Sequence, residues 1–108
     1  MSTQEKQTQE QGKKHGEVHV TVDYLPATED YKHEYPRQVV LETIRADAKN
    51  FFGVQDRTEG RDTYTYYLVH DGERIQNTEI TLEQLIGEHA EGAHFSLVEE
   101  ITTGGAAS

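Results

Sequence analysis

The chain contains no cysteine and no tryptophan, and basic residues are few. Without cysteine it can form no disulfide framework, no thiolate metal site and no cysteine nucleophile. Ten Lys and Arg residues stand against 20 Asp and Glu residues, which gives a formal net charge of -10 at pH 7. A field of this sign repels phosphate backbones and anionic membrane surfaces, so neither nucleic acid nor a membrane is expected as a partner.

Long apolar runs are also missing from the sequence. No segment approaches the roughly 20 apolar residues of a membrane span. The polar residues at the N-terminus lack the apolar core of a signal peptide. We therefore expect a cytoplasmic protein, and the 108 residues have room for one domain.

The sequence does not indicate an enzyme or a metal site. A domain of this size leaves little volume for a deep catalytic pocket, and no Ser, His and Asp set stands out. The acidic segment 56–62 lacks the alternating ligands of a calcium loop. No cofactor is expected, because the six histidines show no ligand spacing; they are His15, His19, His33, His70, His89 and His94.

Residues 1–16 and the residues that follow differ in composition. After the initiator methionine, the first segment has no aliphatic or aromatic side chain, so burial cannot offset its ordering entropy and we expect a disordered polar arm. The folded domain is expected over 17–103. It begins with a strand in which Val18, Val20 and Val22 alternate with polar residues.

A second strand and a helix are expected next. The second strand covers Tyr31–Gln38, and Pro36 would end its hydrogen bonding because proline has no N–H. Apolar residues then recur at helical spacing, with polar residues on the other side and Gly53 as the C-terminal stop. The expected apolar stripe is Leu41, Ile44, Ala48 and Phe51, flanked by Val40 and Phe52; the outer residues are Glu42, Arg45, Asp47 and Lys49.

The second half of the sequence predicts a polar loop over 54–62, a central strand over Tyr64–Val69 and a tight turn at Asp71-Gly72. Arg74-Ile75 would return as a short strand. Thr81 precedes one helical turn, which Gly87 ends. A last strand then places Phe95, Leu97, Glu99 and Ile101 on one face. This order predicts an α+β fold in which one helix crosses a mixed sheet of four to five strands.

The segment 68–105, LVHDGERIQNTEITLEQLIGEHAEGAHFSLVEEITTGG, resembles ubiquitin and its relatives, the β-grasp modifiers. The shared order is strand, glycine turn, short strand, Thr-Leu helical turn, alternating strand and Gly-Gly. The polar arm, the acidic balance and the short tail look more narrowly like the ubiquitin-like proteins that bacteria encode beside activating, conjugating and protease-like enzymes. The resemblance implies a β-grasp fold.

The same resemblance implies a reactive C-terminus at 104–108. A protease would remove Ala106–Ser108, an activating enzyme would adenylate the Gly105 carboxylate, and a conjugating enzyme would pass it to target proteins. The final bond would be an ester, a thioester or an amide. Gly104 and Gly105 suit passage through a narrow channel because they have no Cβ. The extended stem that partners grip would be Ile101, Thr102 and Thr103.

Three apolar residues fall on positions that resemble the outward apolar patch of ubiquitin. They are Val69, Val98 and Leu25, and exposed apolar clusters tend to be contact sites. Two alternatives stay open, because a one-residue slip would turn either valine into the core. The nearby Tyr64, Tyr66 and Tyr67 are expected to join the core with a wet hydroxyl edge.

Lysines are the possible acceptors if the protein modifies itself into chains, although each could equally serve solubility alone. They are Lys6, Lys13 and Lys14 in the polar arm, with Lys32 and Lys49 in the domain.

Two departures from ubiquitin and three rival functions accompany this interpretation. Glu99 and Glu100 stand where the tail of ubiquitin is basic, so partner surfaces would need the opposite charge. The tail between the last strand and the glycines is also about one residue longer than in ubiquitin.

One rival is a sulfur carrier of the same fold, although such carriers generally end at the glycine. The second is a non-covalent adaptor, which would keep working without Gly104–Ser108. The third, a small enzyme, would need a cleft that the sequence does not indicate.

Overall fold

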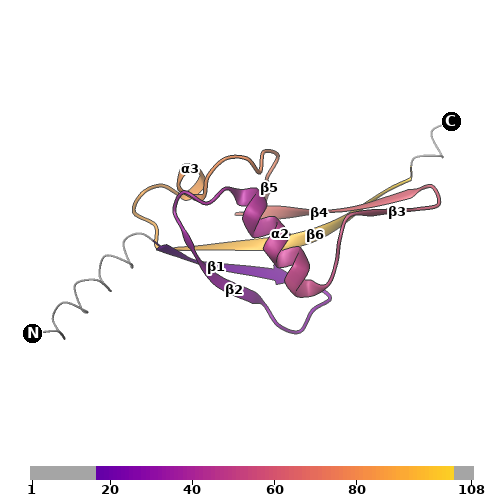
Figure 1. Cartoon of the computed structure of the whole chain (residues 1–108), viewed down its shortest axis with the longest axis horizontal. Helices are drawn as coiled ribbons and strands as arrows, with labels where there is room; N and C mark the ends of the chain where they lie inside the picture. Colours follow the sequence, from indigo (N-terminus) through magenta and orange to yellow (C-terminus); the bar gives the residue numbers. More distant parts are fainter. Residues whose placement is uncertain (1–16, 104–108) are drawn as a thin grey trace, which may run out of the picture.

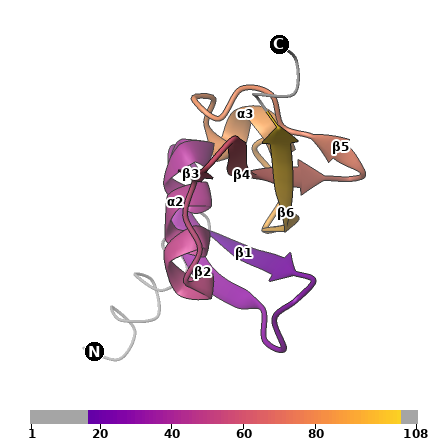
Figure 2. The same ribbon diagram turned by 90° about the vertical axis from the view of Figure 1, so that its right-hand side faces the viewer.

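The computed structural model describes residues 17–103, which form one sheet with a helix packed across one of its faces (Figures 1 and 2). In chain order the elements are β1 (Glu17–Tyr24), β2 (Tyr31–Pro36), α2 (Leu41–Phe52), β3 (Arg57–Glu59), β4 (Asp62–His70), β5 (Glu73–Arg74), α3 (Leu82–Ile86) and β6 (Gly92–Thr103). Neither helix in this part of the chain is long and apolar enough to cross a membrane.

The sheet is mixed, as the sequence predicts. Within the described residues it has six strands in the order β2-β1-β6-β4-β3, and β5 pairs with β4. β1 runs parallel to β6, whereas the other neighbours are antiparallel. The long connection between β2 and β4 carries α2 across the sheet, so the α+β class is confirmed.

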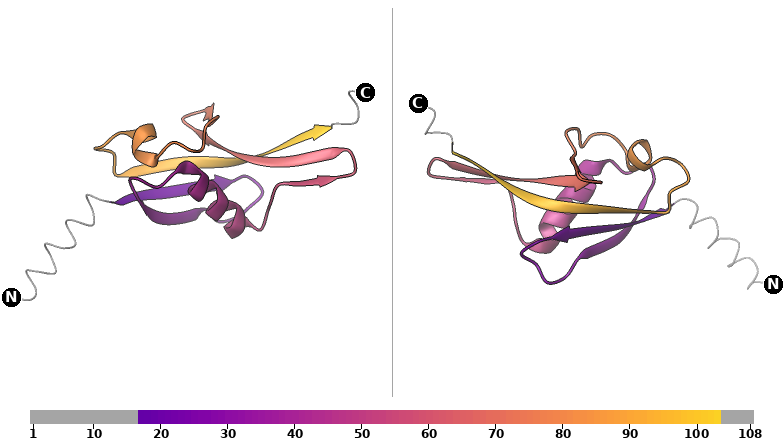
Figure 3. Two further views of the ribbon diagram at one scale, coloured as in Figure 1. Left: turned by 45° about the horizontal axis from the view of Figure 1, so that its top comes forward. Right: turned by 180° about the vertical axis from the view of Figure 1, so that it is seen from behind.

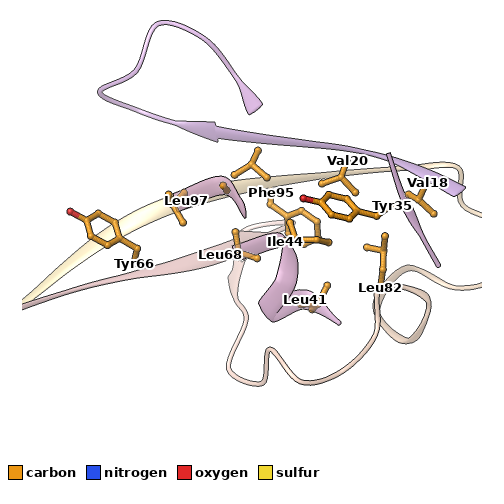
Figure 4. Packing of buried hydrophobic residues seen from close by; sticks show 12 residues of the cluster. Val18, Val20, Tyr35, Leu41, Ile44, Tyr66, Leu68, Leu82, Phe95 and Leu97 are labelled. Atoms are coloured by element: carbon orange, nitrogen blue, oxygen red, sulfur yellow. The ribbon is translucent and has the colours of Figure 1, made fainter. Parts of the chain in front are cut away.

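The core lies between the sheet and α2 (Figure 4). The alternation expected for β1 is confirmed, because Val18, Val20 and Val22 are buried. Three members of the expected helix stripe are buried as well: Leu41, Ile44 and Ala48. Leu82 of α3 closes one end of the cluster, and Tyr66 lies at the other end in Figure 4.

The last turn of α2 differs from the prediction. Phe52 packs against the core, whereas Phe51 is 48% exposed and its ring lies 5.3 Å from that of Tyr31. The two residues follow Ala48 by three and four positions, and both spacings continue a helical stripe. The assignment of Phe51 to the stripe was therefore wrong by one position.

The predicted turn and helical cap in the second half are confirmed. Asp71 and Gly72 have φ angles of 53° and 80°, the left-handed conformation that a two-residue hairpin turn needs. Thr81 caps α3 through a reciprocal pair of hydrogen bonds with Gln84. The Gln84 backbone N–H donates to the Thr81 hydroxyl at 3.1 Å, and the Thr81 backbone N–H donates to the Gln84 side-chain oxygen at 2.8 Å. This arrangement satisfies two amide groups of the helix start.

The polar loop expected over 54–62 contains a strand that the prediction missed. β3 occupies three residues of it and pairs with the start of β4, Arg57 opposite Tyr64 and Glu59 opposite Asp62. Three residues are too few to show a period of two in the sequence. The strand forms because its neighbour is already extended and offers an open edge.

The sheet extends well beyond the helix at one end. β1 accompanies β6 only as far as the pair of Tyr24 and Leu97, whereas β6 continues along β4 to the pair of Thr103 and Asp62. We call the projecting part of the sheet, residues 57–66 together with 98–103, the arm; this name does not include the polar segment 1–16. The arm consists of β3, the start of β4 and the end of β6, and Figures 1 and 3 show it projecting past α2 and β1.

Candidate functional site at the end of β6

The predicted tail stem lies in the arm and forms part of the sheet. Ile101, Thr102 and Thr103 pair with Tyr64, Thr63 and Asp62 of β4 in turn. All three stem residues are exposed, and Ile101 keeps 54% of its surface accessible although it shares the inner face with Phe95 and Leu97. Ile101 is exposed because β6 extends beyond the end of α2, the helix that covers this face.

The tip of the arm ties the stem to the β3–β4 hairpin. The Thr103 hydroxyl donates a hydrogen bond of 3.0 Å to the Asp62 carboxylate. The stem is therefore held in an extended conformation up to Thr103 by its pairing with β4 and by this side-chain bond.

A second brace runs along the inner face of the arm. The Arg57 guanidinium lies 4.0 Å from the centre of the Tyr64 ring and donates to Glu59 Oε2 at 2.8 Å and to the Tyr66 hydroxyl at 3.2 Å. Tyr66 in turn donates to Glu99 Oε2 at 2.7 Å. These bonds link β3, β4 and β6 across the arm.

The pKa values of this group shift in the direction that its contacts require. Burial and the bond to Glu99 raise the pKa of Tyr66 above its usual value, so the hydroxyl stays protonated and donates. The hydrogen bonds of Arg57 to Glu59 and Tyr66 raise its guanidinium pKa above the usual range. Each group therefore keeps its role over the whole physiological pH range.

The base of the arm is held by a charged cluster on α2. Asp56 accepts from Arg45 at 2.6 Å and from the Tyr66 amide at 3.1 Å, and its carboxylate lies 3.3 Å from the Lys49 ammonium. Partial burial alone would raise the pKa of Asp56, but the hydrogen bond and charge of Arg45, together with Lys49, lower it. Arg45 also donates to the Tyr66 carbonyl at 2.6 Å. Both cations had been assigned to the outer helix face, yet their side chains are mostly covered.

The two predicted patch valines lie on the outer face of the sheet. Val69 follows the buried Leu68, and Val98 follows the buried Leu97, so alternation turns both away from α2. Val69 pairs with Ser96, two positions from Val98, which makes the valines diagonal neighbours on adjacent strands. Of the two registers left open by the sequence, the structure has the outward one.

Leu25, the third predicted member, lies in the turn after β1 and is 94% exposed. It directly follows Tyr24, which pairs with Leu97 beside Val98. The chain order therefore puts Leu25 at the border of the outer face, on the side of Val98.

A cation lies beside the valines. The Arg74 guanidinium lies 4.0 Å from the centre of the Tyr67 ring and 2.9 Å from Glu100. Of the three tyrosines expected to join the core, Tyr66 does so, whereas Tyr64 stacks with Arg57 in the arm and Tyr67 packs under Arg74. Glu100 is thus neutralised locally, whereas Glu99, two positions before the stem, has no cation at ion-pair distance among the described residues.

Several predicted residues lie outside the described residues. They are Gly104, Gly105, the segment Ala106–Ser108 and the lysines Lys6, Lys13 and Lys14. Of the two lysines in the domain, Lys32 is exposed on β2, whereas Lys49 is largely covered beside Asp56.

Histidines gather into no metal centre in the part of the chain that the structure describes, where no group of three or more His, Asp and Glu side chains could hold an ion. His94 and Asp23 form a pair at 2.6 Å on the outer face, and His19 lies 3.1 Å from Glu34.

The sequence analysis missed Arg57, Asp62 and Arg74 as residues that hold this site. A signal for the first two was present, because Gly60-Arg61 is a Gly-X pair flanked by Thr58 and Thr63 at mirrored positions. Gly60 has a φ angle of 62°, as the first central residue of a two-residue hairpin turn requires.

No family model matches the chain, and no curated protein matches it significantly. Solved structures do match. The ubiquitin of Caldiarchaeum subterraneum superposes with a TM-score of 0.59 at 16% identity, covering 82% of this chain and all 100% of that one. A designed protein based on ubiquitin gives 0.56 at 14% identity, with 79% and 90% covered. A ubiquitin-like domain from Arabidopsis thaliana gives 0.53 at 13% identity, with 76% of each chain covered. The chain therefore has the ubiquitin-like β-grasp fold.

Proposed function

We propose that this protein is a ubiquitin-like modifier that is conjugated through Gly105. A protease cuts after Gly105, an ATP-dependent enzyme adenylates the new carboxylate, and a conjugating enzyme transfers the glycyl group to target proteins in the cytoplasm. The observation that carries the proposal is the position of the stem. β6 ends at Thr103 on the projecting end of the fold, and the next two residues in the sequence are the glycines.

The chemistry needs a C-terminus that another protein can reach. Hydrolysis of the bond between Gly105 and Ala106 consumes one water and leaves a glycine carboxylate. That carboxylate attacks the α-phosphate of ATP and releases pyrophosphate, and an acceptor nucleophile then displaces AMP from the acyl adenylate, directly or through an enzyme thiol. The modifier itself supplies the acyl group and a folded surface for recognition.

The folded body offers surfaces that such enzymes can recognise. Val69 and Val98 form an apolar spot on the outer face, and Arg74 beside them adds a positive group. Glu99, two positions before Ile101 on the same face of β6, adds a negative charge that has no cation at ion-pair distance among the described residues. The proposed partners accordingly combine an apolar contact with a basic residue near the stem.

The test uses protein ending at Gly105, ATP and the proposed adenylating enzyme from the same organism, followed by intact mass measurement. Modifier that carries AMP, or modifier joined covalently to an enzyme thiol, is expected. Protein with bulky residues at both glycines, G104L/G105L, is expected to give none. An equal adduct yield from this variant would contradict the proposal.

The adaptor alternative is favoured by one observation, the outward orientation of Val69 and Val98 together with the exposure of Leu25. Deleting Gly104–Ser108 separates the two functions. A modifier loses its activity in that deletion, whereas an adaptor that uses the outer face keeps it.

A further inference from the structure

One edge of the sheet is left open along the arm. β1 borders β6 as far as Leu97, and beyond this point Val98–Thr103 pair with β4 alone. Figure 3 shows this yellow end of β6 running on without a strand on its other side. Alternate residues of a strand direct their N–H and C=O groups to opposite neighbours. Half of the backbone groups in Val98–Thr103 therefore face the open side, where no backbone group of residues 17–103 bonds to them.

The residues of this edge favour strand pairing. Four of the six are β-branched: Val98, Ile101, Thr102 and Thr103. The other edges of the described sheet are less suitable. β3 has only three residues and β5 only two, and β2 ends at Pro36, which has no N–H to donate.

The side chains along the edge specify what would fit beside it. Glu99 and Ile101 lie two positions apart on the inner face. Glu99 accepts from the Tyr66 hydroxyl at 2.7 Å and is exposed, and Ile101 is the most exposed large apolar residue of the arm at 54%. A strand added here sets its own side chains beside these two, so a basic residue and an aliphatic residue two positions apart complement them.

We propose that Val98–Thr103 bind an extended segment of a partner protein by strand addition, and that this segment carries a basic residue two positions from an aliphatic one. Backbone hydrogen bonds supply the affinity, and the pairing with Glu99 and Ile101 selects the segment. A second copy of the chain is disfavoured, because each chain carries a formal charge of -10 and self-pairing brings two sets of Glu99 and Glu100 together. The proposal concerns the described edge and does not depend on conjugation at Gly105.

The test is a nuclear magnetic resonance titration of the isotope-labelled full chain with the acetylated and amidated peptide Thr-Thr-Val-Thr-Arg-Val. In an antiparallel alignment this peptide sets its arginine beside Glu99 and its central valine beside Ile101. Shifts of the amides of Val98–Thr103 are expected at millimolar peptide, with β2 unaffected. A matched peptide with glutamate in place of arginine should bind about fivefold more weakly or worse.

Two charge variants decide whether Glu99 selects the peptide. E99K should weaken binding of the arginine peptide by about fivefold or more, and E88K, the same charge change at an exposed bend before β6, should leave it unchanged. E99Q provides the milder change if E99K does not fold. The proposal is overturned if the edge amides do not shift, if β2 responds instead, or if E99K binds as well as E88K. Concentration-dependent shifts at the edge without peptide would also overturn it, because a second copy would then be the occupant.

Discussion

The Thr103 hydroxyl donates a hydrogen bond of 3.0 Å to the carboxylate of Asp62, which joins the end of the last strand to the tip of the β3–β4 hairpin. The two residues are 41 positions apart in the sequence. The bond therefore holds the end of the stem in register with β4 as far as Thr103. The proposed activating enzyme would therefore meet a three-stranded arm up to Thr103.

Removing this bond should loosen the stem without unfolding the domain. In D62A the one of the two adjacent amides, Thr102 or Thr103, that bonds to β4 is expected to exchange with solvent about two to fivefold faster, because one exposed hydrogen bond is worth about 0.5–1 kcal/mol. Hydrogen exchange measured by nuclear magnetic resonance checks this. T58A, a change in the outer strand of the same hairpin, serves as the control, and equal exchange in D62A and T58A would show that the bond contributes nothing.

Adjacent residues of β4 should respond very differently to the same truncation. Leu68 is fully buried and Val69 faces outward, so L68A should cost about 3–4 kcal/mol of unfolding free energy and V69A less than about 1 kcal/mol. Urea denaturation measures both values. The double variant V69E/V98E should also remain folded. Its unfolding would mean that these valines belong to the core in a shifted register.

Periodicity predicted the elements whose pattern is longer than three residues. The alternation around Val20 and the helical spacing of Leu41, Ile44 and Ala48 were each long enough to identify the element and its buried face. The faces of the final strand were also assigned correctly. Periodicity could not show how far α2 covers the inner face of the sheet. Ile101 lies on the same face as the buried Phe95 and Leu97, yet the helix does not reach it.

The arm was not foreseen because its contacts join distant and polar residues. Arg57 and Glu59 look like loop residues, and they become part of a strand only through backbone pairing with Tyr64 and Asp62 of β4. The open register of Val69 and Val98 had the same cause, since a slip of one residue is invisible until the partner strand is known. The reactive glycines remain a prediction, because they lie outside the described residues.

The helix end at Gly53 provides a test of the sequence-based stop signal. Gly53 has a φ angle of 73° and its amide donates to Asn50 at 3.2 Å, which ends α2 in a left-handed residue. G53A should lower the unfolding free energy by about 1 kcal/mol, because a side chain disfavours this conformation. Thermal unfolding of G53A and of N50A, an exposed substitution in the same turn, separates the backbone effect from a general loss at the helix end. An equal loss in both would assign the effect to the turn as a whole.

Asp56 should make the stability of the arm base depend on pH. Because Arg45 and Lys49 lower its pKa in the folded protein, the carboxylate binds a proton less readily folded than unfolded. Its contribution is therefore fully present above the unfolded pKa of about 3.9 and is lost as the pH falls through the lower folded value. At neutral pH, D56N should cost about 1 kcal/mol, a value that allows for solvent screening of this partly exposed group.

The measurement compares urea denaturation of the natural chain and D56N from about pH 7 down to about pH 3. The gap between the two proteins should shrink toward the acid end, because protonation removes the charge that the substitution already lacks. D30N, which removes an exposed carboxylate in the turn before β2, should show no comparable gap at any pH. A gap for D56N that stays constant across the range would mean that shape or hydrogen bonding alone, and not the charge on Asp56, holds α2 to the arm.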